Sequence, residues 1–181
     1  TFVGPLLSEL IGVPSLTPYQ GGWCGNELYQ SAFSDEIRAK AQSMTDRLGQ
    51  ALYQRDYRGY FEVDYLIDLD SGDVYLGELN PRITGISAMT NMSNFCYDNV
   101  PLFLFHLLEY SDVEFSIEPA EYNRRSLANG AQATAGQMIF KYTEKPLNII
   151  TQAPVSGIYK LNSDGQLVLQ KAAYDRREAL A

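Results

Sequence analysis

The stretch that decides the fold is GYFEVDYLIDLDSGDVYLGELNPR, residues 59–82. Apolar residues occupy its odd positions from 61 to 69, and acidic residues occupy positions 62, 64 and 68. This alternation with a period of two is typical of a half-buried strand. The run DSGD at 70–73 is a strong turn signal, and the apolar residues of 74–79 follow it. The stretch therefore predicts an antiparallel hairpin over 60–80.

The register of this hairpin brings polar side chains together. With a short loop centred on Ser71, Asp64 lies opposite Glu78, and Glu62 lies opposite Asn80. Because side chains alternate across a strand, these four share one face. The opposite face then carries the apolar residues, which are Phe61, Val63, Tyr65, Ile67, Tyr75 and Leu79. We expect the apolar face to pack under helices.

The polar face is a candidate metal site. Carboxylates directly opposed on neighbouring strands lie about 4.5–5.5 Å apart at Cβ and repel each other. A divalent cation removes this repulsion, and oxygen ligands on rigid strands suit Mg²⁺, with substrate phosphates completing its octahedron. Asp64, Glu78 and Asn80 are therefore candidate metal ligands, and Arg82, which follows Pro81, is a candidate clamp for a phosphate or carboxylate. Alternatively, the acids form the solvated face of an ordinary antiparallel sheet.

Residues 59–82 resemble the C-terminal signature of the ATP-grasp superfamily, which includes carbamoyl-phosphate synthetases, biotin carboxylases, D-alanine–D-alanine ligases and many amide-forming ligases. The family pattern is a strand that bears an acid or amide, a hairpin turn, and a second strand that ends in Glu-x-Asn-x-Arg. In this chain Asp64 supplies the first element, and Glu78, Asn80 and Arg82 supply the second. The separation of 14 positions between Asp64 and Glu78 is the one that carbamoyl-phosphate synthetase-like members show.

The resemblance implies an α+β fold, namely the C-terminal subdomain of an ATP-grasp domain, with an antiparallel sheet flanked by helices. We assign residues 1–111 to this part and residues 112–181 to a smaller, appended strand-rich region. The chain begins at Thr1 in an apolar stretch, without a methionine. We therefore expect it to be a piece of a longer protein, whose upstream region would carry the family's nucleotide-clamping lysines and Gly-rich phosphate loop.

The resemblance also implies an activity for that longer protein. It would be an ATP-grasp ligase that activates a small-molecule carboxylate as an acyl phosphate on MgATP, for attack by an amine or a similar nucleophile. Asp64, Glu78 and Asn80 would hold one or two Mg²⁺ (or Mn²⁺) ions that bridge the ATP phosphates. Arg82 would be the catalytic residue that steadies the acyl phosphate or the substrate carboxylate. The isolated chain is expected to be inactive.

One departure from the family pattern excludes one of the family's reactions. In biotin carboxylases a glutamate that serves as base follows the arginine, whereas here Arg82 is followed by ITGIS at 83–87, without an acid. Bicarbonate-to-biotin transfer is therefore not expected. Two other classes stay open: a non-catalytic ATP-grasp-like module that binds nucleotide or a partner, and a structural α+β domain with a coincidental motif. The presence of all four motif residues favours the enzyme.

Composition restricts the partners of the chain. Its 181 residues carry 14 Lys+Arg against 22 Asp+Glu, a formal charge of −8, which would repel the phosphates of nucleic acids and anionic membranes. No apolar run has the length that a membrane helix needs. Two cysteines and one histidine exclude a disulfide framework and the usual zinc spacings. We expect a cytoplasmic protein without nucleic-acid or membrane partners, and a homodimer is compatible with this interpretation.

Helical patterns surround the hairpin. Ser34 is a candidate N-cap for an amphipathic helix over 35–56, whose apolar stripe has spacings of four and three and whose wet side includes Arg38. Further helices are expected at 85–97, 100–110 and 118–127. The helix at 100–110 is so densely apolar that we expect it to be buried.

The remaining segments are assigned more coarsely. Residues 12–33 are rich in Gly and Pro and are interpreted as an ordered loop, in which 19–27 is either a substrate loop or a packed Ω-loop. Cys24 has no histidine near it in sequence and is not expected to be a nucleophile, and His106 is expected to be a satisfied core or helix-edge histidine. Extended segments or strands are expected at 2–11, 136–142, 147–151, 156–161 and 166–170.

Overall fold

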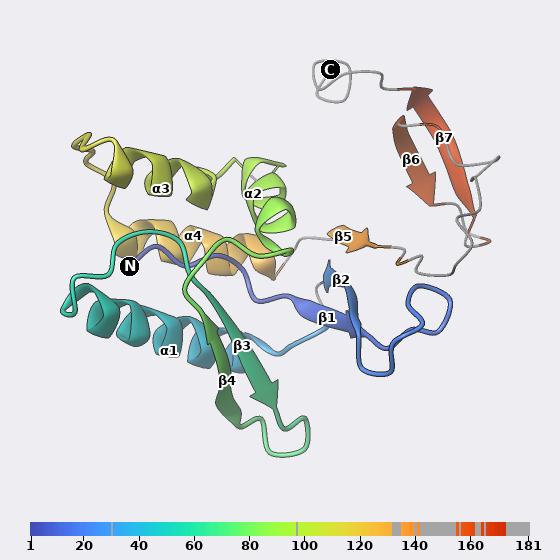
Figure 1. Cartoon of the computed structure of the whole chain (residues 1–181), viewed down its shortest axis with the longest axis horizontal. Helices are drawn as coiled ribbons and strands as arrows, with labels where there is room; N and C mark the ends of the chain where they lie inside the picture. The colour runs from blue at the N-terminus through green and yellow to red at the C-terminus, as the bar shows by residue number, and fades with distance from the viewer. Residues whose placement is uncertain are drawn as a thin grey trace. The chain divides into compact units, whose positions relative to one another are not determined.

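The computed structural model describes residues 1–29, 31–96, 98–131, 135–139, 141, 155, 157–161, 164 and 166–172. The chain divides into two compact units, Thr1–Tyr142 and Thr143–Ala181. Among the described residues there are four helices and three small antiparallel sheets, so the coarse α+β prediction is confirmed (Figure 1). The sheets are β1-β2-β5, β3-β4 and β6-β7.

Helix α1 (Asp35–Tyr53) begins at its predicted cap. The backbone N–H of Ile37 donates to Ser34 Oγ at 3.3 Å, and Asp35 and Glu36 occupy the first turn, where the helix dipole favours carboxylates. The helix ends three residues before the predicted position 56, and residues 54–56 continue as a turn. Arg38, assigned to the wet side from the sequence, is in fact buried, with only 4% of its surface exposed.

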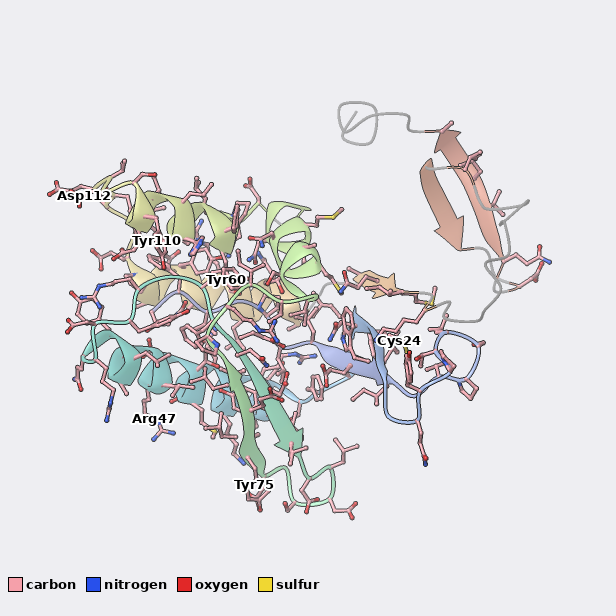
Figure 2. The ribbon with its side chains drawn as sticks, viewed as in Figure 1. Cys24, Arg47, Tyr60, Tyr75, Tyr110 and Asp112 are labelled. Carbon is pink, nitrogen blue, oxygen red and sulfur yellow. The ribbon has the colours of Figure 1, made fainter. Side chains whose placement is uncertain are left out.

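Strands β3 (Glu62–Ile67) and β4 (Val74–Asn80) form the predicted hairpin. Its inner register is confirmed, since Asp64 pairs with Glu78 and Glu62 pairs with Asn80. The outer half is shifted by a β-bulge between Asp64 and Tyr65, and Tyr75 pairs with Leu66. The placement of Tyr75 on the apolar face is therefore wrong. Its side chain is 55% exposed at the outer part of the hairpin (Figure 2).

Strand β2 (Trp23–Leu28) is the central strand of a sheet that also contains β1 (Ser8–Ile11) and β5 (Ala135–Met138). The interpretation of 12–33 as a loop is wrong for β2, because Gly25 and Asn26, which resemble turn residues, lie inside this strand. Asn26 is fully buried, where its side-chain amide donates to the Ser8 carbonyl and its Oδ1 accepts from Trp23 Nε1.

Gly25 is required where β2 meets β5. Its φ is +143°, and a Cβ at this position would overlap the Gln137 carbonyl of the neighbouring strand. We expect Gly25→Ala to lower the free energy of unfolding by about 2–3 kcal/mol in urea denaturation, from backbone strain and loss of strand pairing. Gly21→Ala is the control: its φ is +71° with nothing within 4 Å of the new Cβ, so it should cost only the strain, about 1 kcal/mol. Equal costs for the two variants would contradict this account.

Three further helices confirm the sequence patterns: α2 (Ser87–Cys96), α3 (Leu102–Tyr110) and α4 (Pro119–Gly130). The expected burial of α3 is wrong, because only Phe105 is fully buried, whereas Leu107 is 47% and Tyr110 is 70% exposed. Phe105 stacks on Phe2, with ring centroids 3.9 Å apart. The helix therefore packs through one face and leaves the other exposed.

Helix α4 is hydrogen-bonded to two other segments of the first unit through Asn123. The Asn123 side chain accepts from the Val3 N–H at 2.8 Å and donates to the Thr1 carbonyl at 3.0 Å, and its own carbonyl accepts from Gln42 of α1. These bonds connect α4 with the N-terminal segment and α1. The first unit thus extends through the boundary that the sequence suggested between 111 and 112.

The second unit contains the hairpin of β6 (Gly157–Leu161) and β7 (Leu167–Ala172), at the positions predicted for 156–161 and 166–170. The strand predicted at 147–151 lies outside the described residues. None of the helices in the described ranges combines the length and apolar character needed to cross a bilayer.

Candidate functional site

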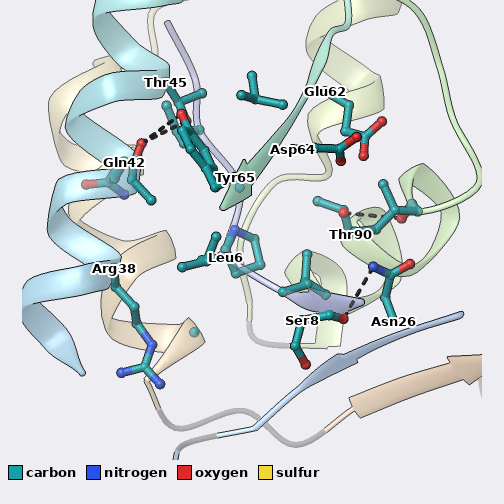
Figure 3. A pocket seen from close by; sticks show the side chains of 18 of the residues that line it. Leu6, Ser8, Asn26, Arg38, Gln42, Thr45, Glu62, Asp64, Tyr65 and Thr90 are labelled. Atoms are coloured by element: carbon teal, nitrogen blue, oxygen red, sulfur yellow. Dashed lines mark hydrogen bonds between the residues drawn. The ribbon is translucent and has the colours of Figure 1, made fainter. Parts of the chain in front are cut away.

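The predicted site residues lie on one face of the β3–β4 hairpin. Directly paired residues of an antiparallel ladder project on the same side, so Asp64 and Glu78 point together, as do Glu62 and Asn80. Figure 3 shows the carboxyl groups of Glu62 and Asp64 next to each other beside a cavity. The bulge lies beyond Asp64, so it leaves this part of the register intact.

Glu62 carries the strongest electrostatic signature of the site. Partial burial, and then the adjacent Asp64 side chain, raise the pKa of Glu62 from 4.5 to about 7. Two carboxyl groups that share a half-buried site resist simultaneous ionisation. Near neutral pH the Glu62 carboxyl group is therefore partly protonated.

A further acid, Glu9 of β1, belongs to this cluster and was missed from the sequence. Partial desolvation, followed by the charges of Asp64 and Glu78, raises the pKa of Glu9 above its usual value. Glu9 precedes the hairpin by more than 50 residues and lies in an apolar segment without a recognisable motif. The tertiary fold brings it to the acidic face, because Glu9 lines the same cavity as Glu62 and Asp64.

Arg82 follows β4 and contacts the Asn80 side chain. Its Nη2 donates to Asn80 Oδ1 at 2.9 Å, and its Nη1 donates to the Ile83 carbonyl at 3.3 Å. The side chain is exposed, and across the described residues no carboxylate forms a salt bridge with it. Arg82 thus orients the Asn80 amide and presents a positive charge at the end of β4.

The donor set fits a hard cation that also binds phosphate oxygens. Asp64 and Glu78 offer carboxylates, and Asn80 offers an amide oxygen already shared with Arg82. Within the described ranges, no group of three or more His, Cys, Asp or Glu side chains is arranged to hold a metal by itself. Mg²⁺ is commonly held by one or two carboxylates together with substrate phosphates and water. The residues present therefore suit Mg²⁺ only together with further oxygen ligands, such as phosphate or water.

A cavity of about 430 Å³ adjoins the acidic cluster. It is bounded by residues 3–9, by α1 and by β3, and Glu9, Glu62 and Asp64 are among its lining residues. Arg38 of α1 also lines the cavity, and it forms an ion pair with Asp35 at 3.0 Å. Most of the remaining wall is apolar. The cavity therefore has a largely apolar lining, and the acidic residues Glu9, Glu62 and Asp64 lie together in one part of it.

The other candidates from the sequence do not join this site. Cys24 is fully buried, and its thiol donates to the Leu10 carbonyl at 3.1 Å, which fits a packing role (Figure 2). His106 Nδ1 accepts from the Tyr60 N–H at 3.1 Å, so the prediction of a satisfied histidine is confirmed. The candidate substrate loop at 19–27 is mostly strand β2, and only its Asn26 lines the cavity.

No protein-family model matches the chain, and neither a curated protein nor a solved structure matches it. The functional interpretation therefore depends on the residues of the hairpin and on their geometry.

Proposed function

We propose that this chain is the metal-holding, C-terminal part of the ATP-grasp domain of an ATP-dependent ligase. The observation that carries the proposal is the pairing of Asp64 with Glu78 and of Glu62 with Asn80 on one face of the β3–β4 hairpin. An arrangement that opposes carboxylates is unfavourable by itself, and a bound cation makes it favourable.

Each residue of the motif has a separate task in this proposal. Asp64 and Glu78 would hold Mg²⁺ or Mn²⁺ through carboxylate oxygens, and Asn80 would add its amide oxygen. When bound, the cation would neutralise part of the negative charge of the ATP phosphates. Arg82, held by Asn80 at 2.9 Å, would orient the acyl phosphate or the substrate carboxylate with its planar guanidinium. Fixed positive groups of this kind act where negative charge develops in the transition state.

The substrates of the proposed reaction are a small carboxylic acid and an amine, joined through a carbon–nitrogen bond in the cytoplasm. The cavity beside the acidic face, at about 430 Å³, is in the range of small-molecule sites. A non-catalytic ATP-grasp-like module remains the second candidate, because the described residues include no Gly-rich phosphate loop paired with clamping lysines. The two candidates differ in turnover and not in metal binding.

Trapping with hydroxylamine tests the proposed reaction in the longer protein that we expect to contain this chain. An acyl phosphate reacts with hydroxylamine to give an acyl hydroxamate, so ATP and Mg²⁺ together with the correct carboxylic acid should yield hydroxamate and phosphate in equal amounts. The isolated chain should give none. ATP binding without hydroxamate from any acid in a broad panel would favour the non-catalytic module instead.

A further inference from the structure

Two neighbouring sheets of the first unit end in strands that have a partner on one side only. In the described part of the chain, β3 pairs with β4 alone and β1 pairs with β2 alone. Residues 4–7, which lead into β1, take part in none of the backbone-to-backbone hydrogen bonds found among the described residues. Exposed strand edges carry unpaired N–H and C=O groups and are templates for a further strand.

The two edges face the same cavity. Its lining includes every residue of 60–67 and every residue of 3–9, but no residue of β4. A strand that met a cavity through one face would contribute alternate residues only, because successive side chains point to opposite faces. The consecutive lining therefore means that β3 and the segment leading into β1 present their edges to this space.

We propose that this groove binds an extended peptide strand with alternating basic and apolar side chains. The strand would pair with the free edge of β3 on one side and with the edge of β1 on the other. The two separate sheets would then become one sheet with the order β4-β3-peptide-β1-β2-β5. This inference concerns the sheet edges and uses the cavity that the proposed function assigns to a small-molecule substrate, so the peptide and that substrate would compete for the same space.

Charge complementarity selects the chemistry of the peptide. The groove carries Glu9, Glu62 and Asp64, whereas among its lining residues the cation Arg38 is paired with Asp35. A lysine or arginine that projects to this side relieves the mutual repulsion of the acids. A glutamate at the same position of the peptide would add to the repulsion among these acids.

The other side of the groove selects apolar residues. Ala41 of α1 and Leu127 of α4 line it, together with Leu6 (Figure 3). A strand projects its side chains alternately, so one side of the peptide would contact these residues while the other meets the acids. This division is the familiar basis of recognition by strand addition, in which main-chain bonds give affinity and alternate side chains give specificity.

The test is fluorescence anisotropy with a labelled octapeptide of alternating lysine and valine. We expect saturable binding with a Kd of about 10–100 μM, and a loss of about tenfold or more in the Glu9→Lys variant. The control variant Glu114→Lys makes the same change of charge at an exposed position outside the groove and should bind as the unaltered chain does. A second peptide, with N-methylated valines, keeps the charge but cannot form the ladder and should bind at least tenfold more weakly.

Three results would overturn the proposal. Equal binding of the N-methylated peptide would mean that charge alone is recognised. The absence of saturable binding up to about 1 mM would mean that the edges are not accessible to a peptide of this chemistry. If the chain sediments as a dimer that Glu9→Lys dissociates, a second copy occupies the groove. Support in addition to anisotropy would be slower amide hydrogen exchange in β1 and β3, with exchange in β7 unchanged.

Discussion

Glu78→Gln is expected to lower ATP-dependent hydroxamate formation by the longer protein about a hundredfold, without lowering its stability. Glutamine keeps the shape of the side chain but removes one anionic ligand of the cation. A loss of about 3 kcal/mol of transition-state stabilisation corresponds to roughly a hundredfold in rate. Asp64→Asn removes the opposing charge of the same pair and should have an effect of the same size.

The free energy of unfolding of these two variants should rise, although their activity falls. Asp64 and Glu78 are directly paired, so removing either charge relieves repulsion and should raise the free energy of unfolding by up to about 1 kcal/mol. The control Glu114→Gln, an exposed acid outside the hairpin, should change neither quantity. Initial rates and urea denaturation of the same preparations measure both effects. If both carboxylate variants unfold much more easily and keep their activity, the acids are structural and the metal site is wrong.

Glu62→Gln is expected to stabilise the metal-free chain in a pH-dependent way. Folding raises the pKa of Glu62 from 4.5 to about 7, so the folded state prefers the protonated carboxyl group. The stabilising contribution of Glu62 is therefore complete below about pH 4.5 and is lost as the pH rises through about 7. Glutamine imitates the protonated form at every pH, so it avoids this loss.

The size of the effect follows from the pKa change. A shift of this size corresponds to about 3 kcal/mol, which screening of the half-exposed group reduces to about 1–2 kcal/mol. Urea denaturation should show Glu62→Gln more stable than the unaltered chain by that amount at about pH 8, and nearly equal to it at about pH 4.5. Glu114→Gln should follow the unaltered chain at both pH values. A difference that does not change with pH would contradict the assignment.

Local sequence signals were sufficient for the inner part of the hairpin and for the start of α1. The DSGD turn and the alternation from 61 to 69 predicted the inner pairs of the hairpin, and the pairing of Asp64 with Glu78 is confirmed. Ser34 was sufficient to place the start of α1, because a side-chain cap acts within one turn. These features depend on residues that are close in sequence.

Features that depend on distant neighbours could not be predicted in this way. The extra residue of the bulge, Gly77, moved Tyr75 to the other face; a glycine inside a strand is a signal for a bulge, but it does not predict how the register shifts. Gly25 and Asn26 resemble turn residues, and only the approach of β5 explains why a central strand contains them. Glu9 joined the acidic cluster for the same reason, since no residue near it in sequence indicates that it lines the same cavity as Glu62 and Asp64.

Manganese-induced broadening of backbone amide signals tests the central claim most directly. Mn²⁺ can replace Mg²⁺ at oxygen sites and broadens NMR signals of nearby nuclei, so the isolated chain can be used even if its affinity is weak. The account predicts that the amides of 62–64 and 78–80 broaden first, and that Glu78→Gln removes this effect while Glu114→Gln leaves it. Broadening that begins instead at the acids of the hairpin turn, 68–73, and persists in Glu78→Gln would contradict the metal site.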